Sequence, residues 1–219
     1  MSNIRVTGFK WVPPFVQGLV RDLRVRWALE EAGLPYEEKL LGQGDQNSPE
    51  YRAIQPFGQV PVYEEGDLQL FESGSIVLHI AEKSPVLMPR DPAARARVIT
   101  WMFAALNSVE PHLLTYAGLD TFFAKEEWAR LRKPSALAMA QTRLNGLAAG
   151  LGDREYFERQ FSAADILMTS VLRFVKHLPL VSEIPTLAAY QARCEARPAF
   201  KRALAAQLAP FERYAPAAA

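Results

Sequence analysis

The sequence predicts an α/β domain with the element order strand, helix, strand, helix, strand, strand, helix, followed by an all-helical domain. Apolar and polar residues alternate over short stretches early in the chain, which is typical of strands. Later in the chain, apolar residues recur at helical spacing nearly to the end. Between the two parts, residues 84–92 contain three prolines and no periodicity. We therefore expect two domains, over 1–84 and 92–219.

In the first part, prolines and a glycine mark where the elements end. Two prolines follow the first alternating stretch and force a loop. Gly33, with Pro35 after it, is typical of the end of a helix. Ser48 and Pro49 are typical of a helix N-terminus. Strands are expected at 4–9, 36–41, 59–63 and 68–71, and helices at 19–32, 49–54 and 76–83. The strand-helix-strand order implies a parallel pair, and the final two strands form a hairpin.

The second part is rich in alanine, which is the best helix former. The first helix of this part should be long and should break at Pro111, because proline disrupts a helix interior. Helices are expected at 93–109, 126–131, 135–149, 162–176, 186–197 and 198–207.

Composition points to an ordinary globular protein. Of the 219 residues, 49% are hydrophobic, and the formal net charge of +1 gives no reason to expect a nucleic-acid or membrane partner. The lone cysteine, Cys194, excludes an intrachain disulfide and is expected to be a buried small hydrophobe. The start of the chain lacks the apolar run of a signal peptide, and no stretch approaches the ~18 apolar residues of a membrane span. We expect a cytoplasmic protein.

The most informative segment surrounds Pro61, which stands in a stretch that otherwise predicts a strand. A central strand cannot spare the amide, so Pro61 should lie at an edge or follow a cis peptide bond. A cis Val60–Pro61 bond would turn the backbone N–H and C=O of Val60 outward. An extended peptide could then pair with these groups as an added strand.

Glu72 and Ser73 follow the predicted hairpin, where a helix begins with Ser73 as its candidate N-cap. The free N–H groups and positive dipole end of that helix would hold a carboxylate. The Glu72 carboxylate would pair with an ammonium group. A ligand with an extended backbone, an α-amino group and an α-carboxylate suits this arrangement, and glutathione has that shape.

These residues resemble the glutathione-site signature of the cytosolic glutathione transferases, in which Gln59-Val60-Pro61 is followed by Glu72-Ser73. The resemblance covers nearly the whole chain. Residues 24–33 resemble the first helix of the family, and residues 161–166 resemble its buried capping motif. In that motif Ser162 and Asp165 form a variant of the capping box. The resemblance implies a thioredoxin-like N-terminal domain and an all-helical C-terminal domain.

The family implies a role for each matching residue. The backbone of Val60, with Gln59 and Pro61 beside it, would contact the cysteinyl part of glutathione. Glu72 and Ser73 would hold the γ-glutamyl end. The loop around Gln43 would lie near the glycyl end. The family also implies a homodimer that serves in detoxification, with glutathione as its co-substrate.

The sequence departs from the family at the group that stabilises the glutathione thiolate. Family members use a Tyr at the end of the first strand, or a Ser or Cys at the start of the first helix. No Ser, Thr, Tyr or Cys occurs between Phe9 and Glu31. Arg21, by its charge, and Gln17, by its amide, are the remaining candidates for catalysis, together with backbone N–H groups of the helix start. The alternative is that Arg21 is a solvated surface charge.

An apolar loop containing Trp11, Val12 and Phe15 stands beside the expected sulfur position. These residues are candidates for one wall of an acceptor pocket, with Tyr116 opposite. The alternative is that they belong to the core or to an interface. The three histidines show no ligand spacing, so no metal site is expected.

The sequence therefore predicts conjugation of the glutathione thiolate to small hydrophobic electrophiles. One alternative is a glutathione-binding or regulatory member of the same fold without catalysis, which the missing hydroxyl or thiol favours. Another is a glutathione-dependent isomerase or dehalogenase, because a fold alone does not decide the reaction. A thiol reductase is disfavoured, because Cys194 is remote from the first helix.

Overall fold

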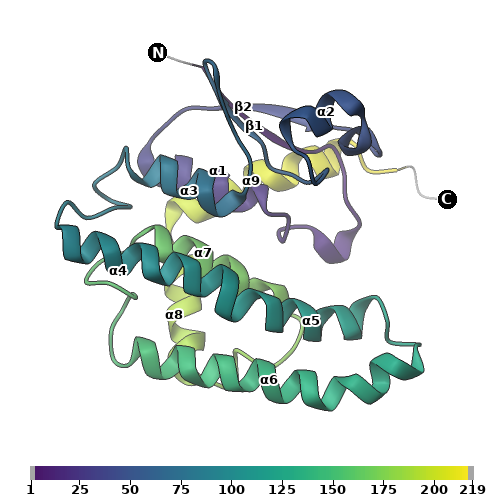
Figure 1. Cartoon of the computed structure of the whole chain (residues 1–219), viewed down its shortest axis with the longest axis vertical. Helices are drawn as coiled ribbons and strands as arrows, with labels where there is room; N and C mark the ends of the chain where they lie inside the picture. The colour runs from purple at the N-terminus through teal and green to yellow at the C-terminus, as the bar shows by residue number, and fades with distance from the viewer. Residues whose placement is uncertain (1–2, 217–219) are drawn as a thin grey trace. The chain divides into compact units, whose positions relative to one another are not determined.

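The computed structural model describes residues 3–216, and it groups them into two compact units (Figure 1). The first unit comprises the described residues up to Leu87 together with those from Arg197 onward. The second unit comprises Met88–Ala196. The chain thus leaves the first unit once and returns to it near its end. The predicted boundaries of two domains, at 1–84 and 92–219, stay a prediction.

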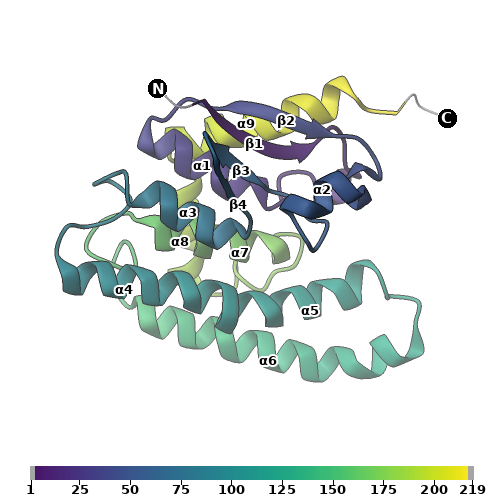
Figure 2. The ribbon, with the colours of Figure 1, turned by 45° about the horizontal axis from the view of Figure 1, so that its top comes forward.

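A four-stranded mixed sheet forms the centre of the first unit (Figure 2). Its order is β2-β1-β3-β4, with β1 parallel to β2 and the other pairs antiparallel. This confirms the predicted parallel pair and hairpin. Pro61 precedes β3 rather than lying inside it, because pairing begins only at Tyr63. The strands are β1 (Ile4–Phe9), β2 (Glu37–Leu41), β3 (Tyr63–Glu65) and β4 (Leu68–Leu70).

Three helices lie between or after these strands, in the predicted order. They are α1 (Asp22–Ala32), α2 (Pro49–Ile54) and α3 (Ser73–Ala81). Gly33 ends α1 in the left-handed conformation, with a φ of 65°, as its position predicts. The Ser48 hydroxyl accepts the Tyr51 amide at 3.1 Å and so caps α2. Helix α1 begins three residues later than predicted, since residues 19–21 form a turn.

Helix α9 (Pro198–Arg213) completes the first unit by packing on α1. The rings of Trp27 and Phe200 meet edge to face with centroids 4.8 Å apart, and both side chains are buried. Arg197 forms a two-pronged ion pair with Glu31, at 2.5 and 2.7 Å. The last helix of the chain, α9, therefore packs on the first helix, α1.

The second unit is all helical. Its helices are α4 (Pro92–Phe103), α5 (Glu110–Thr121), α6 (Glu127–Leu151), α7 (Ala163–Leu172) and α8 (Pro185–Glu195). A π-helical segment, Ala104–Val109, joins α4 to α5 without a gap. The predicted break at Pro111 is wrong, because Pro111 falls in the first turn of α5, where proline is tolerated. The two helices predicted at 126–131 and 135–149 are one helix, with Pro134 inside it.

The capping box at the start of α7 confirms the sequence prediction and lies in the core of the second unit. The Asp165 carboxylate accepts the backbone N–H of Ser162 at 2.9 Å and the N–H of Phe157 at 3.2 Å. It also accepts the Tyr190 hydroxyl at 3.0 Å, so three elements meet on one side chain. Burial raises the pKa of Asp165 to about 6, although all of these donors favour the charged form. Its role is structural.

Within residues 3–216, every helix is either too short or too polar to cross a membrane. Cys194 is fully buried in α8, in agreement with its predicted role as a small core residue.

Candidate functional site

The segment that precedes β3 carries a free backbone edge. The Val60–Pro61 peptide bond is cis, one of the two arrangements that the sequence predicts. The Val60 side chain is buried in a cluster with Leu41, Tyr51 and Val62. Among the described residues, no backbone group hydrogen-bonds to the N–H or C=O of Val60. These two groups are therefore available to an extended ligand, as a strand edge would be.

Glu72 and Ser73 stand at the same end of the hairpin as Val60. Tyr63 of β3 lies opposite Leu70 of β4 in an antiparallel pair, so residues before β3 and after β4 lie near each other. The geometry thus brings together the two sequence motifs that are separated by a hairpin.

Glu72 has an unusual backbone conformation, with φ 67° and ψ 109°. It is the one described residue other than glycine with a positive φ, a conformation that costs on the order of 1–3 kcal/mol. Glu72 is exposed and occupies the N-cap position of α3. The expectation that Ser73 is the N-cap is wrong, because Ser73 already has its place in the first turn of the helix.

The Ser73 hydroxyl is buried and accepts a hydrogen bond of 3.2 Å from the guanidinium of Arg24. Arg24 is itself only 2% exposed and comes from α1, so this contact links two helices at the start of α3. No predicted site role falls on Arg24. A buried arginine must find polar partners, but the sequence does not name the partner 49 residues away.

The start of α1 presents the two residues predicted to be catalytic. Arg21 is half-buried and stands at the N-cap position, one residue before the helix rather than just inside it. The Gln17 amide donates to the Val12 carbonyl at 3.0 Å, and this bond occupies one of its two hydrogens. Phe15, a predicted contact of the acceptor pocket, is 54% exposed.

A buried polar network, which was not predicted from the sequence, adjoins this turn. The Asp22 carboxylate accepts the Nε–H of Arg26 at 2.7 Å, and both side chains are about 1% exposed. Arg26 also pairs with Glu38 of β2. Burial raises the pKa of Asp22, whereas the adjacent Arg26 guanidinium and Gln207 amide act in the opposite direction. Such a buried pair requires all its partners to be present.

Gln207 of α9 closes the network. Its Nε2 donates to the Val20 carbonyl at 3.0 Å and to Asp22 Oδ1 at 2.5 Å. These two acceptors flank Arg21 in the sequence, so α9 fixes the backbone turn from which Arg21 projects. Gln207 and Asp22 are 185 residues apart in the sequence, so no local pattern predicts this role of Gln207.

The remaining predicted residues lie in different environments. Gln43 is exposed in the loop after β2, where the Gly42 N–H donates to Asp45 Oδ2 at 2.7 Å. Trp11 and Val12 are half-buried in the first unit. Tyr116 is buried in α5 of the second unit, with the Lys133 ammonium 5.9 Å from its ring centre.

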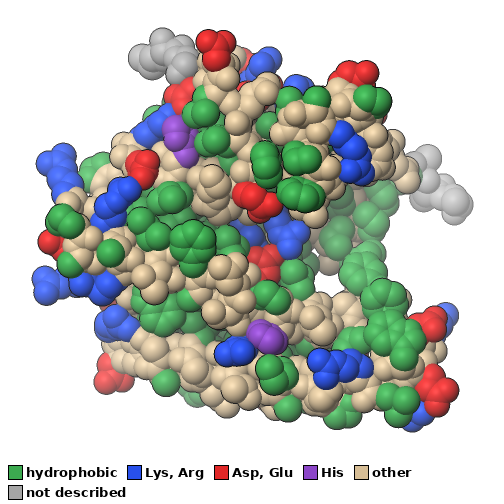
Figure 3. Space-filling model, in the orientation of Figure 1, with side chains coloured by type: hydrophobic (Ala, Val, Ile, Leu, Met, Phe, Trp, Pro, Cys, Tyr) green, Lys and Arg blue, Asp and Glu red, His purple; other side chains and the backbone are tan. Residues whose placement is uncertain are grey.

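Large apolar side chains gather where α5 ends and α6 begins (Figure 3). Phe122 and Phe123 are 64% and 44% exposed. The Phe123 ring lies 5.0 Å from that of Trp128, which is also exposed. These two phenylalanines therefore lie at the surface rather than in the core.

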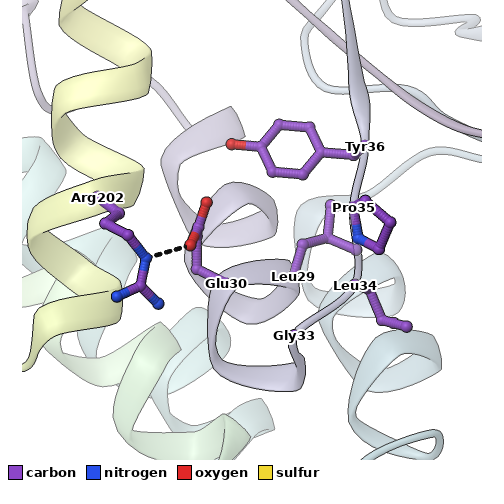
Figure 4. A pocket seen from close by; sticks show the side chains of 7 residues that line it. All are labelled: Leu29, Glu30, Gly33, Leu34, Pro35, Tyr36 and Arg202. Carbon is purple, nitrogen blue, oxygen red and sulfur yellow. Dashed lines mark hydrogen bonds and ion pairs between the residues drawn. The ribbon is translucent and has the colours of Figure 1, made fainter.

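A separate pocket of about 410 Å³ lies at the C-terminal end of α1 (Figure 4). The Glu30 carboxylate and the Arg202 guanidinium form an ion pair of 2.6 Å along it, near the Tyr36 ring. None of the predicted glutathione-binding residues lines this pocket. In residues 3–216, no group of three or more His, Cys, Asp or Glu side chains is arranged to hold a metal ion.

Comparison with known proteins agrees with this geometry. The family model "Glutathione S-transferase, N-terminal domain" matches residues 16–82, which include the turn before α1, the Val60 edge and the start of α3. Glutathione S-transferase F10 of Arabidopsis thaliana is 36% identical over 151 residues, or 63% of this chain and 68% of that protein. The chain belongs to the glutathione S-transferase family. The mixed sheet and the helical unit are the family's thioredoxin-like and all-α parts, as predicted.

Other members of the family match over a larger share of the chain. A tetrachloro-p-hydroquinone reductive dehalogenase of Sphingobium chlorophenolicum is 27% identical over 225 residues, covering 83% of this chain and 90% of that protein. The crystal structure of a glutathione transferase from Burkholderia graminis, with two glutathione molecules bound per subunit, has a TM-score of 0.80. It is 27% identical, and the match covers 93% of this chain and 88% of that one.

We predict that Gln207→Leu lowers the free energy of unfolding by roughly 1–2 kcal/mol, because Val20 and Asp22 lose a buried donor. The loss is limited because the Gln207 carbonyl oxygen has no hydrogen-bond partner among the described residues and is also removed. Urea unfolding measures the change. Arg202→Gln is the matched control on α9, since its half-exposed ion pair should contribute less than about 1 kcal/mol. An equal effect of the two changes would contradict the importance of the buried network.

Proposed function

We propose that the chain is a glutathione transferase, in which bound glutathione thiolate attacks an electrophilic carbon of a small apolar compound. The observation that carries this proposal is the meeting of three features at one end of the hairpin. These are the unpaired backbone of Val60, the exposed carboxylate of Glu72 and the start of α3 at Ser73. Their chemistry is complementary to a γ-linked tripeptide.

Each feature matches one part of glutathione. The Val60 backbone would pair with the cysteinyl residue, with Gln59 and Pro61 on either side. Glu72 would bind the ammonium of the γ-glutamyl end by a charge-assisted hydrogen bond, while the first N–H groups of α3 would bind its carboxylate. Gln43 is proposed to lie near the glycyl end. The glutathione bound to the relative from Burkholderia graminis supports glutathione as the ligand.

The reaction requires the thiol of glutathione to lose its proton to solvent. The thiolate then forms a carbon–sulfur bond, and the leaving group departs with its electron pair. Because a free thiol has a pKa near ~8.5, a positive charge close to the sulfur increases the reactive form at neutral pH. Glutathione is the co-substrate, and the proposal gives no role to a metal ion.

Arg21 is the proposed source of that charge. It stands at the start of α1, where the positive end of the helix dipole adds to its own charge. Gln17 is a weaker candidate, because its amide is already engaged with the Val12 carbonyl. Trp11, Val12 and Phe15 are proposed as contacts for the apolar acceptor. Tyr116 is proposed as a further acceptor residue from the helical unit.

A second candidate function is glutathione-dependent dehalogenation. The similarity to the reductive dehalogenase extends over 90% of that protein, which is a specific reason to test chlorinated substrates. An isomerase or a glutathione-binding protein without catalysis would use the same binding residues. Turnover separates these alternatives from conjugation, whereas binding does not.

We further propose a cytoplasmic homodimer. Phe57 is 61% exposed in the loop before Gln59, and its ring lies 6.1 Å from that of Phe71, which is also exposed. A pair of exposed aromatic rings is suited to the centre of an interface. We expect sedimentation velocity at micromolar concentration to show a dimer, and a monomer would contradict this assembly.

Calorimetry with glutathione tests the binding site. We expect the wild type to bind, and Glu72→Ala to raise the dissociation constant about tenfold or more, since a charge-assisted bond is lost. Glu82→Ala, which removes an exposed carboxylate from the opposite end of α3, is the matched control and should leave affinity unchanged. Absence of any heat of binding in the wild type would exclude the proposed function.

Arg21→Ala tests thiol activation. In this variant we expect the pKa of the bound thiol, followed by thiolate absorbance near 239 nm, to rise toward ~8.5. Turnover of a chloronitrobenzene at pH 7 should fall about tenfold, while glutathione affinity changes little. Arg202→Ala is the control, because Arg202 lies on α9 and pairs with Glu30 at the far end of α1. A thiol pKa that is the same in wild type and Arg21→Ala would assign activation to another group.

A further inference from the structure

The loop between α2 and β3 is held by side chains from α2 and from the loop itself. The Arg52 guanidinium donates to the Pro56 carbonyl at 3.0 Å, and the Gln55 side chain accepts the Phe57 N–H at 2.8 Å. Gly58 has a positive φ of 63°, and a Cβ there would lie 2.9 Å from the Arg52 guanidinium. The segment that leads to Val60 is therefore built on the preceding helix.

Tyr51 makes the contact nearest to Val60. Its hydroxyl donates to the carbonyl of Gln59 at 2.7 Å. Its ring belongs to the buried cluster that also contains Leu41, Val60 and Val62. Burial raises the pKa of Tyr51 to about 12, so the hydroxyl keeps its proton and remains a donor throughout the neutral range.

The Gln59 carbonyl and the Val60 N–H belong to the same peptide unit. That unit is trans, because the Val60–Pro61 bond is the cis bond of the described chain. In a planar trans peptide, the C=O and N–H vectors point in opposite directions. A hydroxyl that holds the Gln59 oxygen toward α2 therefore also turns the Val60 N–H away from α2.

We propose that Tyr51 is a positioning residue for glutathione: its hydroxyl fixes the Gln59–Val60 peptide plane and so aims the Val60 N–H at the cysteinyl carbonyl of the ligand. The role rests on the proposed function of the Val60 edge. Tyr51 itself needs no contact with glutathione, and it takes no part in thiol activation. Without the Tyr51 hydroxyl, the Gln59–Val60 peptide plane would be less ordered in the free protein. Glutathione would then have to order it on binding, which lowers the affinity.

Tyr51→Phe is a sharp test, since it removes one oxygen atom and keeps the ring that packs on Leu41 and Val60. We expect the dissociation constant for glutathione, and the KM, to rise about fivefold, the factor that corresponds to one net buried hydrogen bond. The kcat at saturating glutathione should remain within twofold of wild type, because thiol activation occurs elsewhere. Calorimetry and steady-state kinetics provide these numbers.

Tyr63→Phe is the matched control. Tyr63 is also buried in the first unit, and its hydroxyl donates to Glu65 Oε2 at 2.8 Å on the hairpin rather than to the loop. We expect Tyr63→Phe to leave glutathione affinity unchanged, and thermal unfolding verifies that both variants fold.

Four outcomes decide the proposal. A fivefold loss of affinity in Tyr51→Phe alone supports it. An unchanged affinity in Tyr51→Phe overturns it while leaving the proposed function intact. Equal losses in both tyrosine variants also overturn it, because the effect would then be general. A wild type that takes up no glutathione removes the proposed function and, with it, this role of Tyr51.

Discussion

The buried ion pair between Asp22 and Arg26 is the interaction on which the first unit depends. It forms within one turn of α1, yet it faces the sheet, where Arg26 reaches Glu38 of β2. Gly8 of β1 leaves the space for it, since a Cβ at that position would lie 3.0 Å from both charged side chains. Because desolvating two charges is expensive unless every partner is in place, this pair joins helix, sheet and α9 in one geometry.

That geometry determines where the candidate site can form. Gln207 of α9 hydrogen-bonds to both Val20 and Asp22, so α9 fixes the turn that carries Arg21. Further along α1, Arg24 reaches across to the Ser73 hydroxyl at the start of α3. Two different faces of a single helix thus contribute, since Arg24 is two residues from both Asp22 and Arg26: one face fixes the proposed thiol-activating turn and the other contacts the proposed γ-glutamyl site. Glu72 of the site is exposed, but the polar contacts that shape the site are buried.

The features that could be predicted from the sequence are those set by neighbouring residues. Gly33 and the Ser162–Asp165 capping box follow from backbone and side-chain preferences over four residues or fewer, and both are found. Ser73 was predicted as an N-cap by the same kind of reasoning, but the strained conformation of Glu72 moves the cap one residue earlier. The contact from Gln207 to Asp22 could not be predicted, because it depends on how α9 packs on α1.

The return of α9 to the first unit constrains the order in which the protein can be completed on the ribosome. Trp27 is made early, but the ring of Phe200 that covers it emerges only after the whole second unit has been synthesised. The second unit is continuous in sequence, from Met88 to Ala196. Because domains fold as units during synthesis, the helical insertion can fold while the nascent first unit still lacks its closing helix.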